Sequence, residues 1–116
     1  MTINRIDPNE RLSAAVVHGS LVFLSGQVPN DRSLDCAGQT REVLAKIDGL
    51  LEQAGSSRER MLSAQIWLRD IDRDFAAMNQ VWSEWLPAGC APARATTEAN
   101  LASAEILVEI MVTAAV

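Results

Sequence analysis

The final stretch of the chain most strongly constrains its fold. Residues 106–116 are apolar apart from Glu109 and Thr113. Because successive side chains of a strand point to opposite faces, a strand here is largely apolar on both sides. It therefore belongs in a sheet that is covered on both faces. A carboxylate in such a strand, here Glu109, is expected either to pair with a positively charged group or to have a functional role.

Hydrophobic periodicity predicts two helices and four further strands. Apolar residues recur at helical spacing over Asp35–Ala54, where Ser33 or Asp35 can cap the start and Gly55 the end. A second helix is predicted from about Asp74, ended by the Pro-Ala-Gly segment at 87–89. Its apolar stripe, expected to lie in the core, consists of Phe75, Met78, Trp82 and Trp85. Strands are predicted at residues 14–17, 21–24, 60–68, 93–99 and 106–115.

This order of elements is typical of an α+β domain in which two helices cover one face of a single sheet. With 116 residues, the chain is expected to form one domain, 1–116. No segment is left to cover the second face of the sheet. The sequence therefore predicts a closed homo-oligomer, with any pocket at the seam shared between subunits.

Arg94, after Pro92-Ala93, is the natural counterpart of Glu109, because the planar guanidinium fork binds carboxylates well. If the last two strands form a hairpin turning near residues 101–102, Arg94 and Glu109 lie close to cross-strand neighbours. Two interpretations remain open from the residues alone. The pair is a buried ion pair, or it forms a site for a small organic acid.

Several classes of function are disfavoured. The net charge of −5, without any basic stretch, argues against nucleic acid or an anionic membrane as a partner. Cys36 and Cys90 cannot supply a zinc ligand set and are expected to be reduced thiols. The only histidine, His18, is expected at a solvent-facing turn. Without a recognisable signal peptide or membrane span, we expect a cytoplasmic protein.

Five segments, in order and spacing, resemble the Rid family, also known as the YjgF family. They are Ser25-Gly26-Gln27-Val28-Pro29, the helical segment 39–50, Asp74–Asn79, Pro92-Ala93-Arg94 and Val108-Glu109-Ile110. The resemblance covers essentially the whole chain. Its first and last residues are most similar to the YoaB-like branch.

The resemblance implies a chorismate-mutase-like α+β fold and a homotrimer whose sheets surround a central barrel, with clefts between subunits. Family members of the deaminase type hydrolyse reactive enamines and imines, such as 2-aminoacrylate, to 2-keto acids and ammonia, without a metal or an organic cofactor. The implied partners are therefore small imino or keto acids and further copies of the chain.

The resemblance also assigns roles to individual residues. Arg94 corresponds to the arginine that grips the substrate carboxylate, and Glu109 to the glutamate that orients or activates water. The backbone at Ser25 and Gly26, and at Thr96, lies where relatives offer hydrogen bonds to the substrate or to ammonia. One further residue, Asn79, matches a position near the cleft, unless it only caps or packs the second helix.

Two departures leave the substrate open. Many deaminase members carry a cysteine where this chain has Thr96. The family's N-terminal aromatic lid is missing, since the chain has no Tyr and Leu12 or Ser13 stands near that position. The main alternative is therefore a trimeric protein that binds small carboxylates without turning them over. A purely structural trimer with an internal ion pair is the third possibility.

Overall fold

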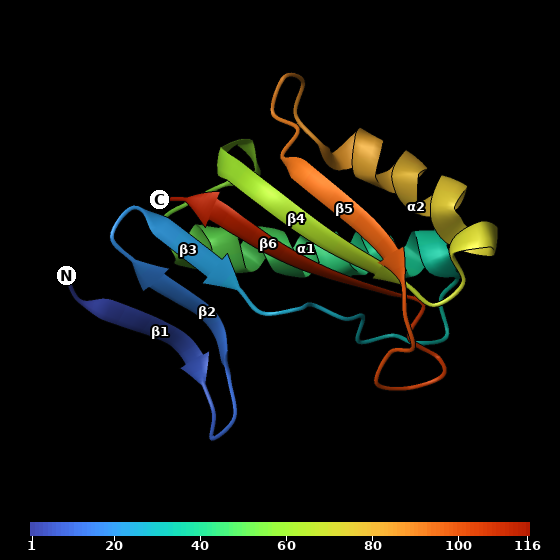
Figure 1. Ribbon diagram of the computed structural model, residues 1–116, viewed down its shortest axis with the longest axis horizontal. Coiled ribbons are helices and arrows are strands. Elements are labelled where there is room, and N and C mark those ends of the chain that lie inside the picture. The colour runs from blue at the N-terminus through green and yellow to red at the C-terminus, as the bar shows by residue number, and fades with distance from the viewer.

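The structure is a computed structural model that describes all residues, 1–116. Its elements are β1 (Ile3–Pro8), β2 (Ser13–His18), β3 (Leu21–Leu24), α1 (Cys36–Gln53), a 3-10 turn (Arg58–Arg60), β4 (Met61–Leu68), α2 (Ile71–Trp85), β5 (Ala93–Glu98) and β6 (Val108–Ala115). The strands form one six-stranded sheet in the order β1-β2-β3-β6-β4-β5. Only β4 and β5 run parallel, whereas every other neighbouring pair is antiparallel. The predicted α+β class, with a mixed sheet and two helices on one face, is confirmed (Figure 1).

Both helices begin at aspartate caps. The Asp35 side chain accepts the N–H of Gly38 at 2.9 Å, as the sequence predicts for the first helix. The second helix begins at Ile71 rather than near Asp74, because Asp70 accepts the N–H of Arg73 at 3.1 Å. The predicted apolar stripe of α2 lies only partly in the core.

Within the α2 stripe, Met78 and Trp82 are buried, but Phe75 is 41% exposed and Trp85 is half-buried. The expectation that the whole stripe lies in the core is therefore wrong at Phe75. Phe75 lies in the first turns of α2, where it borders a surface hollow together with Ile71 and Asp72. The buried positions fall on the face that packs against the rest of the chain.

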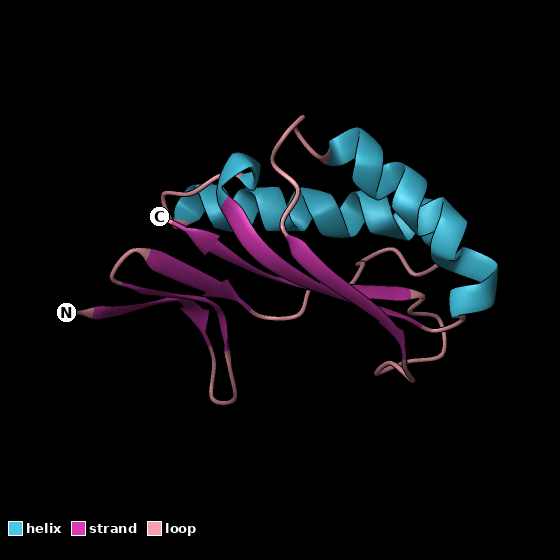
Figure 2. Ribbon diagram, turned by 45° about the horizontal axis from the view of Figure 1, so that its top comes forward, coloured by secondary structure: helices cyan, strands magenta, loops and turns pink.

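The hydrophobic core lies between the sheet and the two helices. Alternate residues of β6 face the helices and are almost fully buried, namely Val108, Ile110, Val112 and Ala114. Figure 2 shows both helices on the same side of the sheet, so that its other side is uncovered. We term this uncovered side the open face. Large apolar side chains remain exposed on it, including Phe23 at 45% and Met111 at 41%.

The sequence predicted strands β2 and β3 but not the first strand, β1. Strand β1 pairs with β2 along its length, yet five of its six residues are exposed. Its residues therefore lack the apolar alternation that marks a half-buried strand. In Figure 1 the β1 and β2 strands extend beyond the part of the sheet that the helices cover. None of the helices combines the length and apolar character needed to span a bilayer.

The predicted hairpin of the last two strands is wrong. Strand β5 pairs only with β4, which separates it from β6. The reason is the connection through α2, which returns the chain parallel to β4 on the far side of that strand. The segment at 99–107 then carries the chain back across the sheet, and β6 fits between β3 and β4.

Candidate active site

Glu109 lies near the start of β6 on the open face, and its side chain is half-buried. The segment after β3 continues alongside it, because Gln27 donates to the Ile110 carbonyl at 2.8 Å and accepts the Ile110 N–H at 3.1 Å. This pairing lays Gly26 directly against Glu109. A Cβ atom at Gly26 would collide with the Glu109 carboxylate. The sequence prediction that these two residues share a site is thus consistent with their contact.

The neighbouring serine is less available than the sequence suggests. The Ser25 hydroxyl donates to the Ala14 carbonyl at 3.2 Å and accepts from Gln27 Nε2 at 3.1 Å. Its N–H also donates to the Ala14 carbonyl, and its own carbonyl accepts from Gln27. By contrast, no hydrogen bond within the chain uses the N–H or the carbonyl of Gly26. The backbone of Gly26 is therefore the free polar group beside Glu109.

Arg94 lies on β5, at the edge of the sheet. In the register it stands beside the buried Ala64, which places it on the side of the sheet covered by helices. Its guanidinium carbon lies 5.6 Å from the centroid of the Trp82 ring. No carboxylate or carbonyl of the chain binds it. Because β5 is an edge strand, Arg94 also borders a shallow hollow of about 330 Å³ that includes Gln65 and Met111.

Two further predicted residues lie in the same layer between α2 and β5. Thr96 stands beside the buried Ile66, and its hydroxyl oxygen is buried without any hydrogen-bond partner. Asn79 is half-buried on α2, three positions before Trp82, and so shares that side of the helix. A buried hydroxyl without a partner is rare and calls for a ligand or water.

The structure thus separates the predicted residues into two groups. We define the Glu109 half-site as Ser25, Gly26 and Glu109, and the Arg94 half-site as Asn79, Trp82, Arg94 and Thr96. Glu109 stands beside Trp67 in the register, whereas Arg94 is aligned with Val112 through Ala64. Two strand spacings and three residues separate the backbones, about 14 Å. The two side chains also lie on opposite faces of the sheet.

The interpretation of Arg94 and Glu109 as an internal ion pair is therefore wrong within this chain. Neither residue takes part in any salt bridge. Burial raises the pKa of the Glu109 carboxyl above its ordinary value, and no cation counteracts it. Burial also lowers the pKa of the Arg94 guanidinium. Each half-site therefore holds one partly desolvated charged group without a partner.

Comparison with known proteins identifies the family. Residues 2–116 match the family described as endoribonuclease L-PSP. The chain is 44% identical to the RutC family protein YoaB of Escherichia coli over 116 residues, covering 100% of both chains. The chain belongs to the L-PSP family, the YjgF or Rid family of the sequence resemblance.

Two similar solved structures have the same fold. A YjgF family protein from Neisseria meningitidis is 46% identical, with a TM-score of 0.95 over 99% of this chain and 95% of that one. An uncharacterised protein from Pseudomonas aeruginosa is 41% identical, with a TM-score of 0.95 over 98% of both chains. The predicted family and its YoaB-like branch are thus confirmed.

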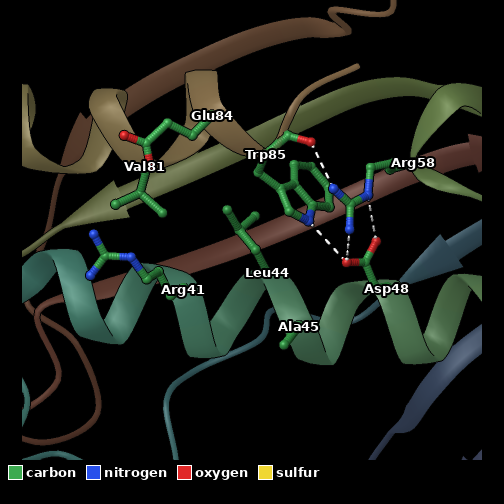
Figure 3. Close-up of a pocket in the computed structure, with 8 residues that line it drawn as sticks. All are labelled: Arg41, Leu44, Ala45, Asp48, Arg58, Val81, Glu84 and Trp85. Carbon is green, nitrogen blue, oxygen red and sulfur yellow. Dashed lines mark hydrogen bonds and ion pairs between the residues drawn. The ribbon is translucent and has the colours of Figure 1, made fainter.

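In this L-PSP family chain, a groove between α1 and α2 contains none of the predicted site residues (Figure 3). Its volume is about 410 Å³. The polar groups at one end bind one another: Arg58 donates to Asp48 and to the Trp85 carbonyl, and the Trp85 indole donates to Asp48 at 2.9 Å. These bonds connect the two helices and the segment before β4. The groove is therefore best explained by helix packing.

The remaining candidates from the sequence belong to neither half-site. His18 is exposed at the end of β2, next to a turn in which Gly19 has φ +60°. Both cysteines are free, and burial raises the pKa of the Cys36 thiol to about 11, which makes it a poor nucleophile. No group of three His, Cys, Asp or Glu side chains is assembled.

Proposed function

We propose that this protein hydrolyses reactive enamines and imines, such as 2-aminoacrylate, to 2-keto acids and ammonia. The observation that carries the proposal is the pair of partly buried, unpaired groups, the Arg94 guanidinium and the Glu109 carboxylate. Leaving such groups without partners costs stability, so their presence in one small chain favours a ligand. Their types, a carboxylate-binding fork and a proton-transfer group, fit an imino acid.

A complete site then requires two copies of the chain. The Arg94 half-site lies at the sheet edge, and the Glu109 half-site lies on the open face. The apolar residues exposed on that face, Phe23 and Met111, favour its burial against another subunit. We propose a homotrimer whose open faces line a central barrel, with Arg94 of one subunit beside Glu109 of the next. This arrangement gives clefts between neighbouring subunits.

The proposed chemistry needs positioning and one proton relay. Arg94 forms two parallel hydrogen bonds with the substrate carboxylate and so fixes the C=N carbon. An enamine first tautomerises to the imine. Glu109 takes a proton from water as the water oxygen bonds to that carbon, and the C=N electron pair moves to nitrogen, which receives the proton. Glu109 then passes the hydroxyl proton of the resulting carbinolamine to its nitrogen, the C–N bond breaks as ammonia leaves, and the C=O bond of the 2-keto acid forms.

The other polar groups serve as hydrogen-bond partners in this proposal. The free N–H of Gly26 donates to the attacking water or the departing nitrogen. The unpartnered Thr96 hydroxyl lies close to where Arg94 holds the carboxylate, and Asn79 borders the same layer. Ser25 contributes by holding Gly26 in place, because its own hydroxyl is engaged.

The imine carbon is itself electrophilic, so the proposed reaction requires neither a metal nor an organic cofactor. The family's description as an endoribonuclease does not suit this chain well. RNA binding requires cationic groups that neutralise phosphates, whereas the net charge here is −5. We therefore propose a cytoplasmic protein that acts on small metabolites and binds neither nucleic acid nor membranes.

The alternative is a trimeric protein that binds small carboxylates without catalysis. Thr96 in place of the usual cysteine and the lack of an N-terminal aromatic favour it. Glu109→Gln separates the two. If the protein is a hydrolase, this variant loses turnover by about 10²-fold or more and still binds a 2-keto acid. If it is only a binder, the substitution changes little.

The direct test measures ammonia and keto-acid release from freshly generated 2-aminoacrylate and from bulkier 2-imino acids. The proposal expects acceleration that disappears in Arg94→Ala. An exposed arginine outside both half-sites, Arg60 in the 3-10 turn before β4, gives the matched control Arg60→Ala, which should keep full activity. If no imine reacts faster than in buffer alone, the hydrolase proposal is wrong.

A further inference from the structure

The support of Arg94 is unusual for a carboxylate-binding arginine. It makes no hydrogen bond or ion pair within the chain, and its guanidinium carbon lies 5.6 Å from the centroid of the Trp82 ring. Trp82 is only 5% exposed, so the ring is held firmly within the core. It packs against Trp85 at a centroid distance of 5.6 Å and an interplanar angle of 41°. Arg94 is thus fixed by a buried π surface rather than by an acidic side chain.

This kind of support leaves the hydrogen-bond donors of Arg94 free. The five N–H donors of a guanidinium lie in its plane, whereas a cation–π contact uses the face of the aromatic ring. An aspartate or glutamate partner would occupy two of these donors and compete with an incoming carboxylate. An indole attracts the cation without that competition.

A second arginine on α2's side of the fold provides an internal comparison. Arg58 also lies over a tryptophan, with its guanidinium carbon 4.8 Å from the Trp85 centroid. However, Asp48 and the Trp85 carbonyl occupy its donors at the same time. Arg58 therefore links α1 to the end of α2, and it has no free pair of N–H donors for a ligand carboxylate. Within one chain, the difference between the two arginines is that no acidic side chain binds Arg94.

We infer that Trp82 is the positioning residue of the Arg94 half-site: it holds the guanidinium in place while leaving its donor fork free for the carboxylate of the substrate. The inference rests on the proposed function only in taking a carboxylate as the ligand. It assigns to Trp82 an effect on substrate affinity, exerted through Arg94. It assigns no part in the proton relay, which belongs to the Glu109 half-site.

The test compares Trp82→Leu with Trp82→Phe in the full, assembled protein. The leucine variant keeps an apolar side chain and removes the π surface, whereas the phenylalanine variant retains a ring. We expect Trp82→Leu to raise KM for a 2-imino acid about ten-fold with kcat nearly unchanged. Trp82→Phe should restore much of the affinity.

Val81→Ala is the matched control, because Val81 is 4% exposed on the same helix and lines the groove between α1 and α2. It should lower thermal stability and leave KM at the wild-type value. The inference is overturned if Trp82→Leu leaves KM unchanged, if Trp82→Phe gives no recovery, or if Val81→Ala raises KM as much. All variants are assayed well below their unfolding temperatures.

A calorimetric titration with pyruvate, a stable 2-keto acid, keeps this test separate from the proposed reaction. If the wild type turns over no imine but binds pyruvate, and Trp82→Leu weakens that binding about ten-fold, the hydrolase proposal fails and the role of Trp82 stands. If the wild type neither reacts with imines nor binds pyruvate, both are wrong.

Discussion

At the scale of single residues, the candidate site depends on what neighbouring side chains leave free. Glu109 and Arg94 have no charged partner in the chain, and Thr96 has a buried hydroxyl without a hydrogen bond. Gly26 matters for the opposite reason, because only a residue without a side chain lets the Glu109 carboxylate lie against the backbone. Each feature costs some stability and so indicates a functional constraint.

Gly26→Ala tests the contact with Glu109. The added Cβ would overlap the carboxylate and displace it, so we expect about a 10²-fold loss of kcat. Gly49→Ala is the control, since a Cβ at Gly49, within α1, meets no atom within 4 Å. It should retain activity and gain about 0.5–1 kcal/mol of stability, because alanine favours helix. Full activity in Gly26→Ala would show that the carboxylate position does not matter.

The pH dependence of stability tests the raised pKa of Glu109. Burial raises this carboxyl pKa in the folded protein, so between the unfolded and folded pKa values the folded state binds more protons. Stability from this group is therefore present at low pH and lost as pH rises through the folded pKa. We expect Glu109→Gln to unfold at a higher temperature than wild type at neutral pH. The difference should vanish near pH 4, and a pH-independent difference would contradict the assignment.

At the scale of the elements, buried amides hold the segments around Glu109. Gln39, fully buried on α1, donates to the carbonyls of Leu34 and Glu105 at 3.1 and 2.9 Å and accepts the N–H of Leu107 at 2.8 Å. It thereby connects the segment before α1 to the segment before β6. Glu109, the proposed proton-transfer residue, lies two positions after Leu107.

Gln39→Met should therefore destabilise the protein by about 3 kcal/mol, because it leaves buried backbone groups without partners. Thr40→Val is the matched control. Its hydroxyl donates to the Cys36 carbonyl and otherwise contacts the Cys36 Sγ, both one turn away in the same helix, and its loss should cost less than about 1 kcal/mol. Thermal unfolding at one protein concentration and hydrogen exchange at Leu107 measure the two effects. Equal losses in both variants would refute a special role for Gln39.

The same scale shows what local patterns could and could not predict. The Asp35 cap, the buried alternation of β6 and the strand at β4 were predictable because each signal lies within a few residues. Strand β1 was missed because nearly all its residues are exposed. The partner of β5 depends on the crossover through α2, which no local pattern encodes. Arg94 and Glu109 could therefore be identified as candidate site residues from the sequence. Their positions on opposite faces of the sheet could not be predicted.

At the scale of the whole molecule, a single chain carries two separate half-sites and one sheet face that no helix covers. The open face carries Glu109 together with exposed apolar side chains, and the sheet edge carries Arg94. The sequence-based expectation that the two residues share a site survives only if they come from different copies. Association is therefore the central claim, because without it neither proposed role can be performed.

Subunit complementation tests that claim most directly. Arg94→Ala and Glu109→Gln proteins are unfolded together, refolded as a mixture and assayed for imine hydrolysis against each variant refolded alone. If each site combines Arg94 of one subunit with Glu109 of the next, random mixing restores about a quarter of the wild-type sites and activity. Each variant alone should remain inactive. A mixture as inactive as its parents, with wild type regaining activity under the same refolding, would contradict a site shared between subunits.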